Sequence, residues 1–342
     1  MVGVERNPIL PLTELFSKIT SYNITLDIQT NHEVGQMDNI WLFSNQGILD
    51  TKGNQVDNVP FQGPVLASAV KNDQIAVVVD WHQVWLYQDE RWEQIAKTDW
   101  KIQCLCWMGN GELLVGTNEA RVAAIKNNQL NFLAGFDQVP ERKLWTTPWG
   151  GAPDIRSFAT ATDGTLYANI HVGWIAQSKD NGESWNNLKD GLEMDVHQVV
   201  VNPKDPSIVI AATASGFYYS RNTGQTFSCT SQDLPHHYQR ACAVFPSGKV
   251  FLTSTSRGPS GGSANLYRSS DNCQNWQQVK GLPDQIVRNI NTFQIVVTGR
   301  ESALVIIEDN QLYETTDLGV NWRKVETQFP HLYGAVVVQS LN

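Results

Sequence analysis

The chain has 342 residues, of which 41% are hydrophobic and 17% charged, and this composition is typical of a globular protein. With 25 Lys and Arg against 34 Asp and Glu, the net charge is −9, and no local basic stripe offsets it, which disfavours a nucleic-acid partner. No apolar run reaches the roughly 18 residues that would span a membrane. We therefore expect neither nucleic acid nor a membrane as a partner.

The N-terminal segment 1–22 is predicted to be a cap that precedes the sheets. It contains the one fair helix candidate, "PLTELFSKIT" at 11–20. The opening "MVGVERNPILPL" lacks the basic stretch and apolar core of a secretory signal. The cysteines show no metal-type pairs and suit a reducing compartment, so we predict a cytoplasmic location. They are Cys104, Cys106, Cys229, Cys242 and Cys273.

Alternating apolar and polar residues predict β-strands along the whole N-terminal half. "ITLDIQT", "NIWLFSN" and "GILDTKG" give three strands near the start, and the ranges 64–96 and 102–134 give four strands each. The first group therefore lacks one strand. The C-terminal run "LYGAVVVQS" at 332–340 is predicted to supply it as the innermost strand, which would close a ring and remove open sheet edges.

Four polar turns of similar sequence follow in the C-terminal half, spaced 42 to 49 residues apart. They read "SKDNGESW", "SRNTGQTF", "SSDNCQNW" and "TTDLGVNW", each at the end of an alternating run. The Ser/Thr and Asp side chains are expected to bond the turn's own amides, the Gly to supply a positive φ, and the aromatic residue to pack on the sheet. The predicted structural residues are Ser178, Asp180, Gly182, Trp185, Ser220, Asn222, Gly224, Phe227, Ser269, Asp271, Trp276, Thr315, Asp317, Gly319 and Trp322.

Repeats of this period predict a single all-β domain over residues 1–342, a seven-bladed β-propeller with four-stranded blades and about 49 residues per blade. The rival doubly wound α/β fold needs long helices between strands, and the sequence has almost none. In two turns a residue departs from the pattern, Asn222 for Asp and Cys273 for Gly. We expect those two turns to be less stable than the others.

The four turns resemble the Asp-box, or bacterial neuraminidase repeat, of β-propellers. In that family the box lies on the outer hairpin at the rim, away from the functional face. Over about 155–325 the chain looks like bacterial cytoplasmic proteins labelled sialidase-like, and more distantly like the photosystem II assembly-factor propeller, which binds a partner and catalyses nothing. That second family carries a leader and a basic patch, and neither is seen here.

In a propeller, the loops that lead into the inner strands and the loops between the second and third strands form one face around the axis. We predict that an anionic ligand binds there, because guanidinium groups offer forked, permanently charged donors. The predicted ligand-binding residues are Arg156, Arg240, Arg288, His197, His171, His82, His237, Arg257 and Tyr333. Trp145 and Trp149 lie in a long connection that could form a partial lid. The alternative is a water-filled channel lined by polar residues.

Catalysis at the same funnel is the competing interpretation, with His171, His197 and Asp195 as candidate catalytic residues. In a sialidase-like site, Arg156, Arg240 and Arg288 would bind the substrate carboxylate, but the N-terminal signature of sialidases is missing and their propellers have six blades. A two-carboxylate glycosidase would draw on Asp80, Glu119, Asp154 and Asp195.

Metal binding is a further alternative, because His82, His171, His197 and His237 come from different blades that meet at the axis. No pair has metal-type local spacing, so we assign no metal ligand and leave the cofactor open. The sequence thus favours a binding or scaffolding propeller whose partner is a small anionic molecule or a protein. The alternative is a sialidase-like glycoside hydrolase or lyase.

Overall fold

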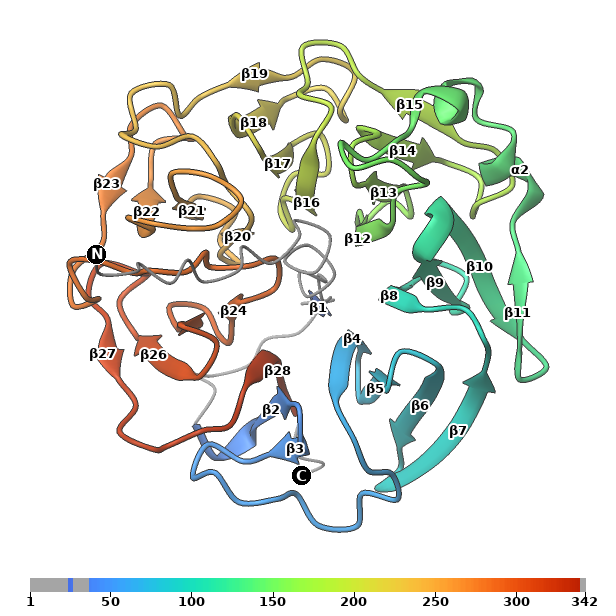
Figure 1. Cartoon of the computed structure of the whole chain (residues 1–342), viewed down its shortest axis with the longest axis horizontal. Helices are drawn as coiled ribbons and strands as arrows, with labels where there is room; N and C mark the ends of the chain where they lie inside the picture. The colour runs from blue at the N-terminus through green and yellow to red at the C-terminus, as the bar shows by residue number, and fades with distance from the viewer. Residues whose placement is uncertain (1–23, 27–36, 339–342) are drawn as a thin grey trace, which may run out of the picture.

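A computed structural model describes residues 24–26 and 37–338, and the predicted helix at 11–20 lies outside them. Seven sheets are arranged in a ring around a common axis, as Figure 1 shows. Apart from one short parallel strand at the axis, neighbouring strands within each sheet are antiparallel, and each blade runs from the axis to the rim. The chain is therefore a seven-bladed β-propeller, and the predicted fold class is confirmed.

The strands of blades two to seven follow one another in chain order. The second blade contains β4 (Val65–Lys71), β5 (Gln74–Val79), β6 (Gln83–Gln88) and β7 (Arg91–Lys97). The third contains β8 (Ile102–Trp107), β9 (Leu113–Thr117), β10 (Arg121–Lys126) and β11 (Gln129–Phe132). The fourth contains β12 (Ile155–Thr160), β13 (Leu166–Ile170), β14 (Ile175–Ser178) and β15 (Asn186–Leu188).

The last three complete blades end in short outer strands. The fifth contains β16 (Val196–Val201), β17 (Val209–Thr213), β18 (Gly216–Ser220) and β19 (Ser228–Cys229). The sixth contains β20 (Cys242–Val244), β21 (Phe251–Thr255), β22 (Asn265–Ser269) and β23 (Gln277–Gln278). The seventh contains β24 (Ile295–Val297), β25 (Ala303–Ile307), β26 (Gln311–Thr315) and β27 (Arg323–Lys324).

The described helical segments are short. They are η1 (Met37–Asn39), η2 (Asn118–Ala120), α2 (Ala134–Asp137) and η3 (Pro140–Leu144). None of the helices described is long and apolar enough to cross a membrane.

The first blade is closed by the C-terminal strand. Here β28 (Leu332–Val337) is innermost and pairs with β2 (Ile40–Ser44), which pairs with β3 (Gly47–Leu49). The pairing joins the two ends of the described chain, as predicted, and it removes the open edges that an unclosed ring would expose.

One strand assignment in the first blade is wrong. The run "ITLDIQT" was expected there, but its described part, β1 (Ile24–Leu26), pairs in parallel with β4 of the second blade. It adds to the axial edge of that sheet, where the backbone groups of β4 have no other strand to bond (Figure 1). The first blade consequently has three regular strands, and its fourth position holds only an isolated bridge between Leu49 and Gln55.

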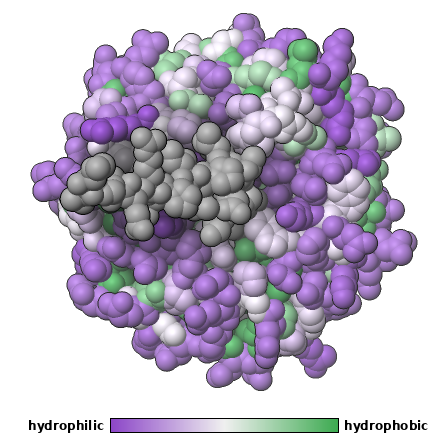
Figure 2. Space-filling model, viewed as in Figure 1, coloured by the Kyte–Doolittle hydropathy of each residue, from purple (hydrophilic) through white to green (hydrophobic). Residues whose placement is uncertain are grey.

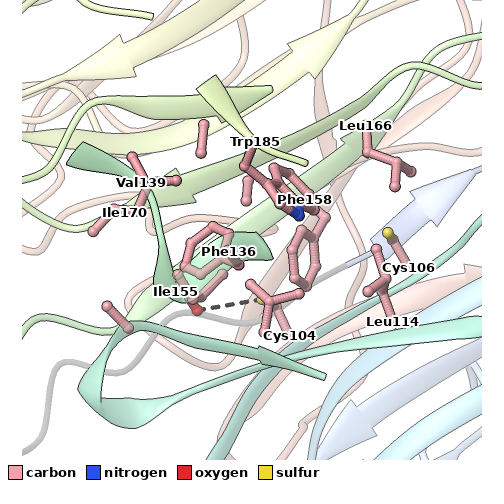
Figure 3. Packing of buried hydrophobic residues seen from close by; sticks show 14 of the residues in the cluster. Cys104, Cys106, Leu114, Phe136, Val139, Ile155, Phe158, Leu166, Ile170 and Trp185 are labelled. Carbon is pink, nitrogen blue, oxygen red and sulfur yellow. Dashed lines mark hydrogen bonds between the residues drawn. The ribbon is translucent and has the colours of Figure 1, made fainter. Parts of the chain in front are cut away.

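Apolar residues on facing sheets hold neighbouring blades together. Between the third and fourth blades, Phe158, Leu166 and Trp185 pack with Cys104 and Cys106, as Figure 3 shows. The Cys104 thiol also donates a hydrogen bond to the carbonyl of Ile155, at 3.2 Å. All five cysteines are free, and four are buried, where burial of a thiol contributes about as much as that of a small apolar group.

The repeated turns 178–185, 220–227, 269–276 and 315–322 lie at the rim between the third and fourth strands of their blades. In the first, Ser178 Oγ donates to Asp180 Oδ1 at 2.8 Å and accepts from the Gly182 N–H at 2.9 Å. The same pair of bonds forms around Ser220, Ser269 and Thr315. The predicted internal bonding of the turns is thus present in all four.

The surface of the described residues carries few exposed large apolar side chains. Those with the greatest exposure are Leu144 and Trp149 in the connection between the third and fourth blades, Val287 before the seventh blade, and Val320 in the last repeated turn. Figure 2 shows one face on which hydrophilic residues predominate and apolar residues are scattered. Where described residues are visible, this face shows no broad apolar patch of the kind that typifies stable protein interfaces.

Candidate functional site

Several inner strands begin with a β-bulge. The pairing of β12 with β13 passes over Arg156, and that of β16 with β17 passes over His197. The equivalent bulges in the second and third blades pass over Leu66 and Gln103. A bulge re-aims the side chain of its extra residue. The same β-bulge therefore recurs at the start of four inner strands, and in the fourth and fifth blades the bulged residue is charged or titratable.

His197 is completely buried, and its ring is held in one orientation. Its Nδ1 lies 2.5 Å from the carbonyl oxygen of Gln239, and a carbonyl only accepts, so Nδ1 carries the proton of this bond. Its Nε2 lies 3.3 Å from Asp195 Oδ1. Burial, the largest influence, lowers the pKa of His197, although Asp195 opposes the shift. The ring is thus neutral at pH 7, with its Nε2 lone pair aimed at a carboxylate.

Asp195 stands between two histidines. Its Oδ1 lies 3.3 Å from His197 Nε2 and 3.4 Å from His171 Nε2. Burial favours the neutral carboxyl, but a proton shared with His197 or His171 and the Arg156 guanidinium hold the pKa of Asp195 well below its ordinary value. Burial and then Arg156 lower the pKa of His171. The group therefore pairs one carboxylate with two neutral imidazoles.

Two arginines lie beside this group. Arg156 is buried and is influenced electrostatically by Arg240, Asp195 and Asp154. Burial and then Arg240 lower the pKa of Arg156 to about 10, so it remains charged at pH 7. Burial raises the pKa of Asp154 to about 6, against the opposing effect of Arg156.

Arg240 is buried and fixed by neighbours from three segments. It donates to Asn291 Oδ1 at 3.1 Å, to the Tyr238 hydroxyl at 3.2 Å and to the Pro259 carbonyl at 3.2 Å. Its guanidinium also lies over the Tyr238 ring. Among the described residues, however, its Nε finds no hydrogen-bond partner. Arg240 thus retains a donor for a ligand or water.

Aromatic rings flank the two histidines. Tyr238 packs on His197 with ring centroids 4.8 Å apart, and Trp149 lies 5.5 Å from His171. Trp149 is half exposed, whereas Trp145 is buried against Phe136 in the core between blades. Of the two tryptophans considered for a lid, the structure therefore brings only Trp149 to the histidines.

Arg288 and Tyr333 lie in a second group. The Arg288 guanidinium forms an ion pair with Asp309, and its side chain is about two-thirds exposed. Asp309 Oδ2 also lies 3.9 Å from His331 Nδ1, and the His331 ring packs on Tyr333. Within the described chain, no contact is recorded between Arg288 and the group around Asp195. Of the three predicted arginines, Arg156 and Arg240 therefore lie beside the group around Asp195, and Arg288 lies in a separate group with Asp309.

The remaining predicted ligand residues bond locally in their own loops. His82 Nδ1 lies 3.2 Å from the Trp100 carbonyl, and the exposed His237 Nε2 lies 3.2 Å from the Gln232 carbonyl. The exposed Arg257 forms a backbone bond with Gly262. The structure therefore does not bring these three residues together with His171 and His197.

Sequence reasoning did not identify Asn291 as the partner of Arg240, nor the bulges that turn Arg156 and His197. A bulge shifts the alternation of apolar and polar residues by only one position. The alternation is weak at the start of each inner strand, so this shift cannot be seen in the sequence. Asp80 and Glu119, two of the carboxylates considered for glycosidase chemistry, are exposed on loops of the second and third blades.

A second opening on the axis has a different character. A cavity of about 120 Å³ is lined mainly by apolar residues of β12, β16, β20 and β24, including Phe158, Val200, Val244 and Val296. Along β12 and β16, a charged or titratable residue thus lies near the start of the strand, and apolar residues lie further along. The polar end alone offers acid, base and cation together.

Comparisons with known proteins agree with this fold. A stretch of 134 residues is 28% identical to a xyloglucanase of Hypocrea jecorina, covering 39% of this chain and 16% of that enzyme. The chain thus spans about a sixth of the length of this curated relative. Among solved structures, an ancestral GH74 enzyme superimposes with a TM-score of 0.56 at 17% identity, covering 83% of this chain and 38% of that one.

A second similar structure is of nearly the same size. YCF48 from Cyanidioschyzon merolae superimposes with a TM-score of 0.60 at 13% identity, covering 83% of this chain and 94% of that one. YCF48 has also been solved bound to a D1 peptide. At these identities the superpositions show the fold alone. The model of the DUF6242 beta propeller domain matches residues 113–331, well over half of the chain, and the chain belongs to that family.

Proposed function

We propose that the chain is a ligand-binding propeller whose axial site takes a small anion carrying a carboxylate or phosphate. The observation that carries the proposal is that two buried guanidinium groups, Arg156 and Arg240, lie close enough to repel each other electrostatically, in a chain of net charge −9. Such a repulsion disfavours burial unless a counter-charge compensates it. Asp195 and Asp154 supply part of that counter-charge. The Arg240 Nε, which has no hydrogen-bond partner among the described residues, supports the binding of a further anion.

The proposal is tested by anion binding to the full chain and to matched arginine variants. Uronic acids, sialic acids and organic phosphates are screened by thermal shift, and hits are titrated by calorimetry. Arg240→Ala should weaken binding by about 100-fold, since a charge-assisted hydrogen bond contributes roughly 1.5–3 kcal/mol. Arg288→Ala is the control, because that arginine lies in the separate group with Asp309. Equal loss in the two variants, or none in Arg240→Ala, would contradict the proposal.

A glycoside hydrolase acting at the same place is the second candidate. It is supported by the xyloglucanase relatives and by the position of Asp154 and Asp195, two carboxylates that both act electrostatically on Arg156. Release of reducing ends from xyloglucan oligosaccharides and from sialosides, measured for the parent and for Asp154→Asn, separates this function from binding alone. A turnover that survives in the variant would exclude Asp154 as a catalytic group.

A protein partner at this site and a cytoplasmic location remain part of the proposal. YCF48, of nearly the same length, takes a peptide, which supports a peptide as an alternative ligand. Buried free thiols support a reducing compartment.

A further inference from the structure

Three donor atoms converge from two neighbouring blades. His171 follows β13, while Asp195 and His197 stand just before and at the start of β16. Their ligand atoms all lie within 4.8 Å of one another, with Asp195 Oδ1 at 3.3 Å and 3.4 Å from the two Nε2 atoms. Ligands about 2.1 Å from a tetrahedral zinc ion are themselves about 3.4 Å apart. The two distances from Asp195 therefore fit ligands of a shared metal ion.

The proton positions lead to the same interpretation. Because His197 Nδ1 donates to the Gln239 carbonyl, Nε2 is the ring nitrogen left to bind a cation, and Asp195 Oδ1 is also an acceptor. Both atoms are buried, and neither finds a hydrogen-bond donor among the described residues. These two atoms lie 3.3 Å apart without an aligned hydrogen bond, a placement that suits a cation bound between them.

The surroundings of His197 match those of a metal-bound histidine. Such a histidine donates its other ring N–H to a carbonyl or carboxylate, which fixes the tautomer and the ring orientation. The bond from Nδ1 to the Gln239 carbonyl has this form, and Gln239 is itself held by Ser231 and Thr253. The packing of Tyr238 on the ring limits its rotation further.

We propose that His171, Asp195 and His197 bind one divalent transition metal ion, of the zinc class, with at least one coordination position open. Two imidazoles and a carboxylate are ligands that suit zinc and its first-row neighbours. Arg156 and Arg240 carry charge of the same sign, so an anion in the open position would raise the affinity for the metal. That last step rests on the proposed function, whereas the binding of the metal does not.

Zinc alone is the probe for the metal site. The full chain, freed of metal with a chelator, is titrated with Zn²⁺ by calorimetry, and bound metal is counted by mass spectrometry after desalting. We expect one equivalent, and a visible spectrum typical of tetrahedral coordination when Co²⁺ replaces zinc. His171→Gln and Asp195→Asn should each weaken binding by about 100-fold or more. His82→Gln is the matched control, a loop histidine that also faces a carbonyl but lies outside the group.

The fold of each variant is checked by its melting temperature, because a variant that unfolds says nothing about coordination. His171 is preferred to His197 for this reason, since it is only partly buried. A parent that binds no more zinc than the His171→Gln variant would overturn the inference. Anion binding by the zinc-free parent would then leave the proposed function standing, whereas zinc binding without any anion binding would retain the metal site and remove the anion.

Discussion

The rim and the axis of this propeller satisfy their polar groups in opposite ways. In each repeated turn the hydroxyl, the Asp or Asn side chain and the nearby amides bond to one another within five residues of chain. At the axis the polar atoms come from distant segments, and Asp195, His197 and Arg240 each retain a buried atom without a hydrogen-bond partner among the described residues. The repeated feature thus satisfies its own polar groups, whereas the axial group leaves polar atoms unsatisfied within the described part of the chain.

Changes at the rim should therefore reduce stability and leave ligand binding to the folded protein intact. Changes at the axis should do the reverse. Three variants test this contrast.

The largest effect is expected at Gly281, where the end of the sixth blade meets the last repeated turn. Its φ is +87°, and a Cβ there would lie 1.9 Å from the carbonyl oxygen of Trp322. Beside this contact the Lys280 N–H donates to the Val320 carbonyl and the Trp322 N–H donates to the Lys280 carbonyl, so the backbone cannot move without losing these two bonds. Gly281→Ala should lower the free energy of unfolding by about 3 kcal/mol, measured by urea denaturation.

Gly164→Ala is the matched control for that variant. Gly164 has the same φ of +87°, but nothing lies within 4 Å of the added Cβ. Only the backbone strain remains, and we expect a loss of about 1–2 kcal/mol. If the two variants lose equal stability, the contact between neighbouring blades is not what makes Gly281 necessary.

A smaller, pH-dependent effect is expected at Asp271. Hydrogen bonds from the Asn275 side chain and backbone lower the pKa of Asp271 to about 2. Because the folded pKa lies below the unfolded value, the stabilisation is complete above about pH 4 and is lost as the pH falls toward 2. Solvent screening limits it, so Asp271→Asn should cost about 1 kcal/mol at pH 7.

The difference between parent and Asp271→Asn should vanish as the pH approaches 2. Asn222 shows why the variant keeps its fold, since an amide at the equivalent position holds the same bonds to Ser220 and Thr226. Denaturation curves at pH 7 and pH 2.5 provide the measurement. A gap that stays constant over this range would mean that the carboxylate charge contributes nothing to the turn.

The rim could be predicted from the sequence because its bonds are local. Ser178, Asp180 and Gly182 lie within five positions, so their spacing alone fixes which atoms meet. The pairing of the closing strand β28 could also be predicted, because the first blade was one strand short and one strand at the C-terminus had no blade of its own. The position of β1 could not be predicted, because a strand of three residues is too short to show which neighbour it pairs with.

The axial site could be predicted only in part. Arg156, His197 and Arg240 occupy equivalent positions in their repeats, and this alone predicts that they lie near one another at the axis of a ring. The position of Arg288 in its repeat predicted that it would join the same site, but its guanidinium forms an ion pair with Asp309 in a separate group. Which arginines converge depends on single ion pairs between loops, and the length of a loop does not determine them.

The smallest effect on stability is expected from His171→Gln. The histidine faces a carboxylate and a neighbouring imidazole, and burial lowers its pKa well below the ordinary value. The side-chain amide of the variant can still donate to Asp195, which also keeps His197 and Arg156 beside it, so no buried charge is left without a partner. The variant should therefore unfold within about 0.5 kcal/mol of the metal-free parent. Added Zn²⁺ should raise the melting temperature of the parent and not that of the variant, because only the parent gains a ligand-dependent increment in stability. A variant that loses as much stability as Gly281→Ala, with zinc making no difference to the parent, would assign His171 to the structure of the propeller and would remove the contrast between rim and axis.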